Sequence, residues 1–195
     1  MNSIVYKVVE EADFQAMYKI YEPYVLNTAI SFETTPPGPR QFSERIRSAA
    51  SDMPWLVCRS GGSVAGYAYA GRHRLRHAYR FSVETSVYVH PDSARQGIGK
   101  GLYSALLGIL VLSGYKTALA GITLPNEPSV KFHESMGFRP VGAYRNVGFK
   151  FGAWHDVGWW QKALADYDAR PQEPVPFSAI LGSEALQRIL ENAAI

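Results

Sequence analysis

The feature that most constrains this chain is a glycine-rich turn between a β-like run and a helical run, within residues 87–101. Such a turn exposes consecutive backbone N–H groups, and the start of a helix adds partial positive charge, so that together they attract phosphate. Glycines at 97 and 99 remove the Cβ atoms that would keep a diphosphate away from the backbone. We therefore predict a phosphate-binding loop made of Arg95, Gln96, Gly97, Ile98, Gly99 and Lys100.

The spacing of this turn excludes two common nucleotide-binding loops. A P-loop requires Ser or Thr after its lysine, whereas Lys100 is followed by Gly101. A dinucleotide-binding fingerprint requires a third glycine at the position of Leu102. The ligand is therefore expected to be a phosphate-bearing molecule of another kind.

Composition limits the classes of protein that the chain can represent. The 195 residues have a net charge of only +3, which gives no support for nucleic-acid binding. The single cysteine, Cys58, allows no internal disulfide and fits a reducing cytoplasm. No signal peptide, membrane-spanning run or metal-ligand cluster is visible. We expect a cytoplasmic protein that binds neither membrane, metal nor nucleic acid.

Strand-like and helix-like segments alternate along the chain, which predicts one mixed α/β domain over 1–165. Residues 31–39 are rich in proline and are expected to form a loop. A polar linker and a short helix form the predicted extension, 166–195. Strands are expected at 4–9, 55–59, 64–71, 82–89, 117–123, 140–145 and 150–162, and helices near 14–24, 42–50, 98–113 and 128–136.

A second motif spans residues 126–138. Asn126 can cap a helix that exits at Gly137, so these residues need have no other role. Nevertheless, Asn126, Ser129 and the final Gly-Phe resemble the Asn-x-x-Ser…Tyr-x-x-x-Gly-Phe motif of the GNAT N-acetyltransferases, with His133 in place of the tyrosine. The Arg-x-Gly-x-Gly turn resembles the acetyl-CoA loop of the same family, although Ala94 replaces its usual Gln or Arg.

Longer strings resemble the phosphinothricin acetyltransferase branch of that family. This resemblance covers roughly residues 4–163 and implies a mixed, mostly antiparallel, twisted sheet splayed at its middle and flanked by helices. It also implies acetyl-CoA as donor, a homodimer, and transfer of acetyl to the α-amine of a small amino acid, such as phosphinothricin, methionine sulfoximine or methionine sulfone. Backbone at Val87, Tyr88 and Val89 would polarise the thioester carbonyl, and Asn126 and Ser129 would contact the donor. The strings lie at 32–36, 68–71, 83–89, 124–130 and 148–158.

Two residues are candidates for proton transfer. An amine attacks a thioester only as the free base, so a nearby group must accept a proton. Glu84, in an apolar strand, is our first candidate; the alternative is an ordinary outward-facing carboxylate. His133 is the second, because imidazole can act as acid or base at neutral pH. Its alternative is a helix surface residue.

The substrate would need cationic donors for its carboxylate. An arginine-rich segment, 72–80, supplies them; a solvated loop or an RNA patch is the alternative. The resemblance implies that Arg74, Arg76 and Tyr79 face the substrate, and that Phe32, Glu33 and Thr34 form a loop over it. Trp154 and His155 are expected in the pocket or at a dimer contact, and Trp159 and Trp160 in the core. Acetylation of another amine (a polyamine, an aminoglycoside or a protein N-terminus) and a non-catalytic CoA-binding module remain as alternatives.

Overall fold

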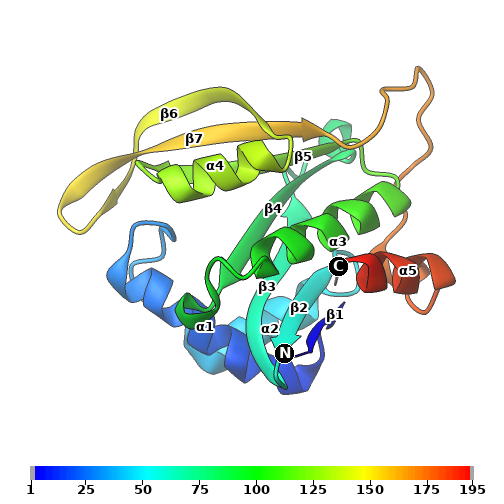
Figure 1. The fold of residues 1–195 in the computed structure, drawn as a ribbon. Helices are drawn as coiled ribbons and strands as arrows, with labels where there is room; N and C mark the ends of the chain where they lie inside the picture. Colours follow the sequence, from blue (N-terminus) through cyan, green and yellow to red (C-terminus); the bar gives the residue numbers. More distant parts are fainter. Residues whose placement is uncertain (1–2, 194–195) are drawn as a thin grey trace.

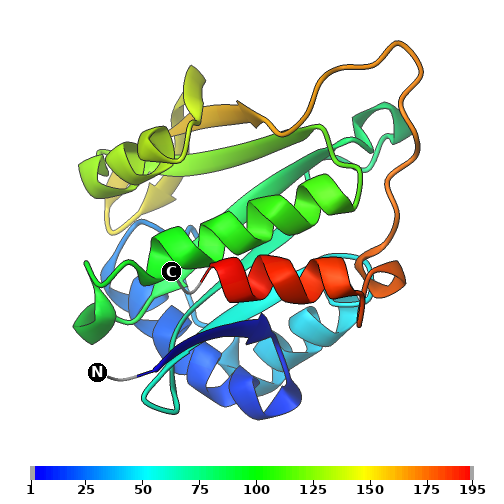
Figure 2. The same cartoon turned by 45° about the vertical axis from the view of Figure 1, so that its right-hand side comes forward.

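The computed structural model describes residues 3–193, which fold around one seven-stranded mixed sheet (Figures 1 and 2). The strand order is β1-β2-β3-β4-β5-β7-β6, and every neighbouring pair is antiparallel except β4 and β5. The mixed, mostly antiparallel sheet is therefore confirmed. The strands are β1 Ile4–Val8, β2 Trp55–Ser60, β3 Ser63–Arg72, β4 Ser82–Val89, β5 Thr117–Leu124, β6 Arg139–Lys150 and β7 Ala153–Ala163. The α-helices are α1 Phe14–Asn27, α2 Gly38–Ala49, α3 Ile98–Leu112, α4 Glu127–Ser135 and α5 Glu184–Asn192, with 3-10 turns at Glu11–Asp13, His77–Tyr79 (η2), Pro91–Ser93 and Phe177–Ala179.

The sheet opens in its middle, between β4 and β5. These parallel strands pair only through Ser82–Glu84 and Thr117–Leu119. Beyond that point β4 continues along β3 to Val89, while β5 continues along β7 to Leu124. The predicted splay is confirmed, and Figure 1 shows the two halves diverging toward the start of α3.

Each face of the sheet is covered by its own apolar cluster, because alternate strand residues point to opposite faces. On one face α3 packs with its apolar stripe, which includes Leu102, Leu106 and Ile109. On the other face α1 and α2 bury residues that include Met17 and Ile46. Cys58 is buried in the first cluster.

Two predictions about element boundaries and packing were wrong. Helix α2 begins at Gly38, inside the proline-rich stretch that was expected to be a loop, because proline is tolerated in the first helical turn. Trp160 lies in the core as predicted. Trp159 lies over Gly121 on the other face of β7, because consecutive residues of a strand point to opposite faces of the sheet.

The chain after β7 is held against the body of the protein. The Phe177 side chain is 1% exposed and belongs to the cluster beneath α3. Leu186 and Ile189 of α5 pack against the same cluster, and α5 lies alongside α3 (Figure 2). Within residues 3–193, the structure contains no helix with the length and apolar character needed to cross a membrane.

Candidate active site

The gap between β4 and β5 lies between the N-termini of two helices. Helix α3 follows β4 and α4 follows β5, so both begin at the carboxyl ends of the diverging strands. Gly97 precedes α3 with φ of 80°, and no side chain caps the helix there. A Cβ at Gly97 would meet nothing within 4 Å, so the turn is open to a ligand. Unsatisfied N–H groups at this position suit a diphosphate.

Backbone of β4 lines the gap. From Thr85 onward β4 pairs only with β3, so its backbone groups on the other side have no strand partner in the part of the chain described. The Tyr88 ring instead packs among tyrosines on the α1 face, and Tyr24 donates a hydrogen bond to the Val89 carbonyl at 2.8 Å. Val87–Val89 therefore offers main-chain groups to the gap, while its side chains pack in the two clusters.

Asn126 and Ser129 lie at the start of α4. The Asn126 Oδ1 atom accepts a hydrogen bond from the Ser129 backbone N–H at 3.2 Å, so this residue does cap the helix. Asn126 also lines a cavity of about 340 Å³ between the end of β5 and the segment that follows α1. The capping role and a ligand contact are thus compatible.

His133 lies in a buried chain of hydrogen bonds that reaches the point where β4 and β5 separate. Its Nδ1 is 2.8 Å from the Ser129 carbonyl, and its Nε2 is 2.9 Å from the Tyr103 hydroxyl. That hydroxyl contacts Thr85 Oγ1 at 3.0 Å, and Thr85 contacts the Leu119 carbonyl at 3.2 Å. Burial lowers the pKa of His133, and the Ser129 carbonyl opposes that effect. The chain joins α4, α3, β4 and β5 where the strands separate.

Glu84 lies on the opposite face of β4 from this chain. Its side chain is 39% exposed, and its Oε1 is 2.8 Å from Nδ1 of His73. The two predicted proton-transfer residues are therefore on different faces, because Glu84 and Thr85 are consecutive in a strand. His73 was missed in the sequence, although it directly follows the end of β3 in the arginine-rich segment.

The arginine-rich segment forms a pocket beside this carboxylate. Arg74, Arg76 and Tyr79 line a cavity of about 540 Å³, together with His73. Arg72 is turned to Asp52, which it contacts at 3.1 Å. Two of the predicted cationic donors and the predicted tyrosine thus lie around one cavity.

The segment between α1 and α2 borders the same face of the sheet. Tyr21 donates a hydrogen bond to Glu33 at 3.0 Å, and Arg45 forms an ion pair with the same carboxylate. Phe32 lies against Gly148 of β6, where a Cβ would overlap its ring, whereas Thr34 is exposed. Tyr21, which binds Glu33, packs against the Tyr88 ring, and Tyr88 is on the same face of β4 as Glu84, so the two carboxylates are on one side of the sheet.

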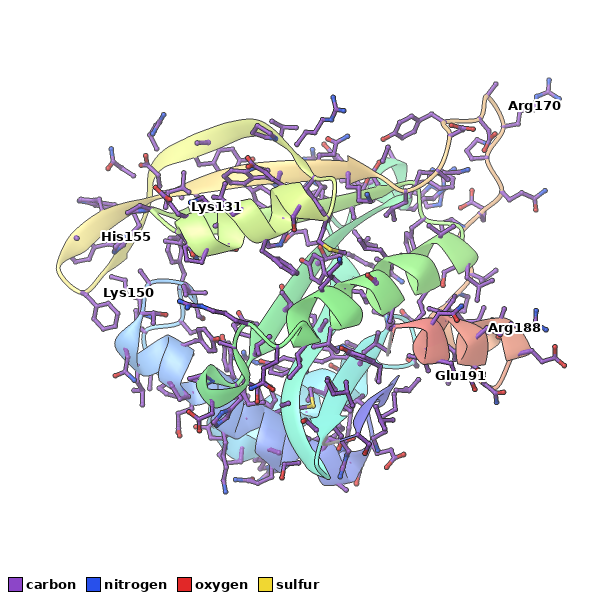
Figure 3. All side chains as sticks on the ribbon, viewed as in Figure 1. Lys131, Lys150, His155, Arg170, Arg188 and Glu191 are labelled. Atoms are coloured by element: carbon purple, nitrogen blue, oxygen red, sulfur yellow. The ribbon has the colours of Figure 1, made fainter. Side chains whose placement is uncertain are left out.

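Lys150 holds this segment in place and was not predicted as a site residue. Figure 3 shows Lys150 at the end of the β6–β7 hairpin, near the segment that follows α1. Its Nζ donates hydrogen bonds of 2.7 Å to the carbonyls of Val25 and Ser31, and burial lowers its pKa. The only signal in the sequence was a lysine between two aromatic residues, Phe149 and Phe151. Its hydrogen-bond partners, Val25 and Ser31, are more than 100 residues away in the chain.

Comparisons with known proteins agree with this geometry. The sequence profile described as "Acetyltransferase (GNAT) domain" matches residues 6–159. A phosphinothricin N-acetyltransferase of Streptomyces viridochromogenes is 39% identical over 84% of this chain and 90% of its own length. An L-methionine sulfoximine/L-methionine sulfone acetyltransferase of Salmonella typhimurium is 33% identical over 84% of this chain and 96% of its own length.

Solved structures show the same similarity. A phosphinothricin acetyltransferase from Sinorhizobium meliloti, crystallised with acetyl-CoA, has a TM-score of 0.83 at 34% identity, covering 89% of this chain and 95% of its own. A putative acetyltransferase from Salmonella typhimurium, solved with acetyl-CoA, has a TM-score of 0.82 at 32% identity, and the match covers 88% of this chain and 99% of its own. The expectation of an acetyl-CoA-dependent acyltransferase is confirmed, and the chain belongs to the GNAT family of acetyltransferases.

Proposed function

We propose that this protein acetylates the α-amine of a small, carboxylate-bearing amino acid. The observation that carries this proposal is the cavity lined by Arg74, Arg76 and His73, whose ring contacts the Glu84 carboxylate. Guanidinium groups bind carboxylates through charge-assisted hydrogen bonds, and a carboxylate next to them can draw a proton from an amine. The relatives named as phosphinothricin and methionine sulfoximine acetyltransferases support the same substrate class.

The residues around the gap fit acetyl-CoA. Open backbone at Gly97 and the N-terminus of α3 would hold the diphosphate, with Arg95 and Lys100 adding positive charge. Main-chain N–H groups of Val87–Val89 would polarise the thioester carbonyl, which is commonly a large electrostatic contribution to catalysis. When bound, this donor supplies the acetyl group that is transferred.

The reaction requires one proton to leave the amine. An α-amino group has a pKa of about 8, so it is mostly protonated at neutral pH. Glu84 provides the negative charge that drives this transfer, and the proton passes to Glu84 or to a group in contact with it. The amine nitrogen then bonds to the acetyl carbon, the C–S bond breaks, and the thiolate leaves. No covalent enzyme intermediate is needed.

Positive charge around the pocket disfavours cationic acceptors. Arg74 and Arg76 would repel a polyamine or an aminoglycoside, whereas they attract an amino acid carboxylate. His133 has both ring nitrogens within hydrogen-bond distance of protein atoms. We therefore propose that it acts through Tyr103, and not by direct contact with substrate.

We further propose that the protein is a homodimer formed through the β6–β7 hairpin. This hairpin is at the edge of the sheet and carries large apolar side chains that are at least half exposed. An apolar surface of this kind is typical of an interface between subunits. These side chains are Val141, Tyr144, Val147, Phe149, Phe151 and Trp154.

A substrate screen tests the proposed function. Purified protein with acetyl-CoA is offered phosphinothricin, methionine sulfoximine, methionine sulfone, common amino acids, spermidine and an aminoglycoside, and thiol release is measured. We expect turnover with the amino-acid-like compounds only. Faster acetylation of spermidine or the aminoglycoside would refute the proposal.

The variant Glu84→Gln tests the base. General acid–base catalysis typically contributes about 10²–10⁴-fold, so we expect a loss of this order in kcat at neutral pH. Activity should recover partly at higher pH, because the amine then loses its proton to solvent. Unchanged activity at neutral pH would remove Glu84 from this role. Circular dichroism of the variant controls for misfolding.

A further inference from the structure

His73 is the residue in closest contact with the proposed base. It follows β3, and the β3–β4 register places Gly71 opposite Glu84. The imidazole Nδ1 and the Glu84 Oε1 are 2.8 Å apart, and the His73 side chain is 16% exposed. The ring is therefore largely enclosed and is joined directly to the carboxylate.

Aromatic contacts fix the orientation of the His73 ring. The Tyr79 ring meets it edge to face at 5.6 Å and 78°, and the Trp159 ring does so at 5.9 Å and 73°. These neighbours come from η2 and β7 respectively. His73 also lines the cavity that contains Arg74 and Arg76. The ring is thus held between the carboxylate and the substrate pocket.

The contact with Glu84 determines which ring nitrogen carries hydrogen. An ionised carboxylate can only accept hydrogen bonds, so Nδ1 must be the donor. In the neutral ring Nε2 is then unprotonated and can accept a proton. The arrangement resembles the acid–histidine part of a catalytic triad, in which a carboxylate orients the imidazole and stabilises its cation.

This inference rests on the function proposed above. We propose that Glu84 and His73 act as one proton-accepting pair, in which the proton from the substrate amine comes to rest on Nε2 of His73. The amine N–H bond breaks, an Nε2–H bond forms, directly or through one water, and Glu84 balances the imidazolium charge. After the C–S bond breaks, the proton passes to solvent or to the departing thiolate, which restores the neutral ring.

Charged groups around the pair are consistent with this proton transfer. Arg74 and Arg76 line the cavity from the same loop, and they favour a deprotonated substrate amine by repelling its cationic form. Arg72 is neutralised by Asp52. On the sheet side, burial raises the pKa of Tyr69, and the negative charges of Glu33 and Glu84 raise it further.

Two substitutions of His73 separate proton acceptance from simple positioning. In His73→Gln, an amide N–H can still bond to Glu84 but cannot take up a proton, whereas His73→Phe removes the bond as well. We expect both variants to lose about tenfold or more in kcat/KM at neutral pH. Their activity should return as the pH approaches the pKa of the substrate amine, about 8. His77→Gln, an exposed histidine of the same loop, is the control and should be unaffected.

Wild-type activity of His73→Gln at neutral pH would overturn the proposal, since a hydrogen bond that orients Glu84 would then be sufficient. Nitrogen NMR of the imidazole gives a readout that does not need turnover. We expect the Nδ1-protonated ring in the wild type and loss of that preference in Glu84→Ala. An Nε2-protonated ring in the wild type would refute the pair even in a fully active enzyme. A wild type without activity on any amino acid would instead refute the proposed function.

Discussion

At the scale of single residues, the sequence suggested candidate positions for the site but not the partners of those residues. Glu84 and His133 were chosen for their chemistry and their place in motifs. Their hydrogen-bond partners, His73 and Tyr103, come from other elements and have no motif of their own. A side-chain pair across a sheet or between helices depends on register and rotation, which residue patterns do not fix.

The buried His133 predicts how stability depends on pH. Its pKa is lowered by burial, so below about pH 6.5 the unfolded chain takes up a proton that the folded protein does not. The free energy of unfolding should therefore fall as the pH drops through that range. In His133→Gln this fall should be shallower, as measured by urea denaturation at several pH values, with His77→Gln as the exposed control. An equally steep fall in His133→Gln would contradict this expectation.

At the scale of elements, the strands and helices were largely predictable, while their exact ends were not. Apolar alternation placed β4 at its observed bounds, and helical spacing placed α3. Helix α2 begins at a glycine followed by proline, residues that usually signal a loop but that also suit the first turn of a helix. Local sequence cannot separate these two uses.

The segment after β7 packs against the core of the preceding domain. Glu173 pairs with Arg80 at 2.6 Å, the Val175 N–H donates to the Ser113 carbonyl at 2.9 Å, and Phe177 enters the core. We expect Phe177→Ala to lower the free energy of unfolding by about 3–5 kcal/mol, because it leaves a cavity in the main cluster. Leu181→Ala, at an exposed position of the same segment, should change little. Chemical denaturation distinguishes this result from that of a loosely attached tail, in which both variants would match the wild type.

At the scale of the whole molecule, the resemblance to a known family implied the splayed sheet, and the structure confirms it. Composition and periodicity alone gave only a mixed α/β chain. Of the exposed apolar side chains on the β6–β7 hairpin, only Trp154 was singled out in the sequence, as a pocket or dimer-contact residue, because a surface strand with aromatic residues has the same pattern as a buried one.

The proposed dimer is tested by placing charge on that hairpin. Phe149→Lys combined with Trp154→Lys should yield a monomer in analytical ultracentrifugation, because both side chains are more than half exposed in one protomer. Val111→Lys, at an exposed apolar position on α3, is the matched control and should leave the assembly intact. A wild type that sediments as a monomer would refute the proposal.

The short parallel pairing of β4 with β5 also limits how deeply a bound molecule can enter the gap between these strands. Any chain that enters between the strands stops where Glu84 still pairs with Leu119, and where Thr85, Tyr103 and His133 fill the space beneath. Because the parallel pairing and the Thr85–Tyr103–His133 chain close this end of the gap, we expect the rate of transfer to fall as the acyl group of the donor becomes longer.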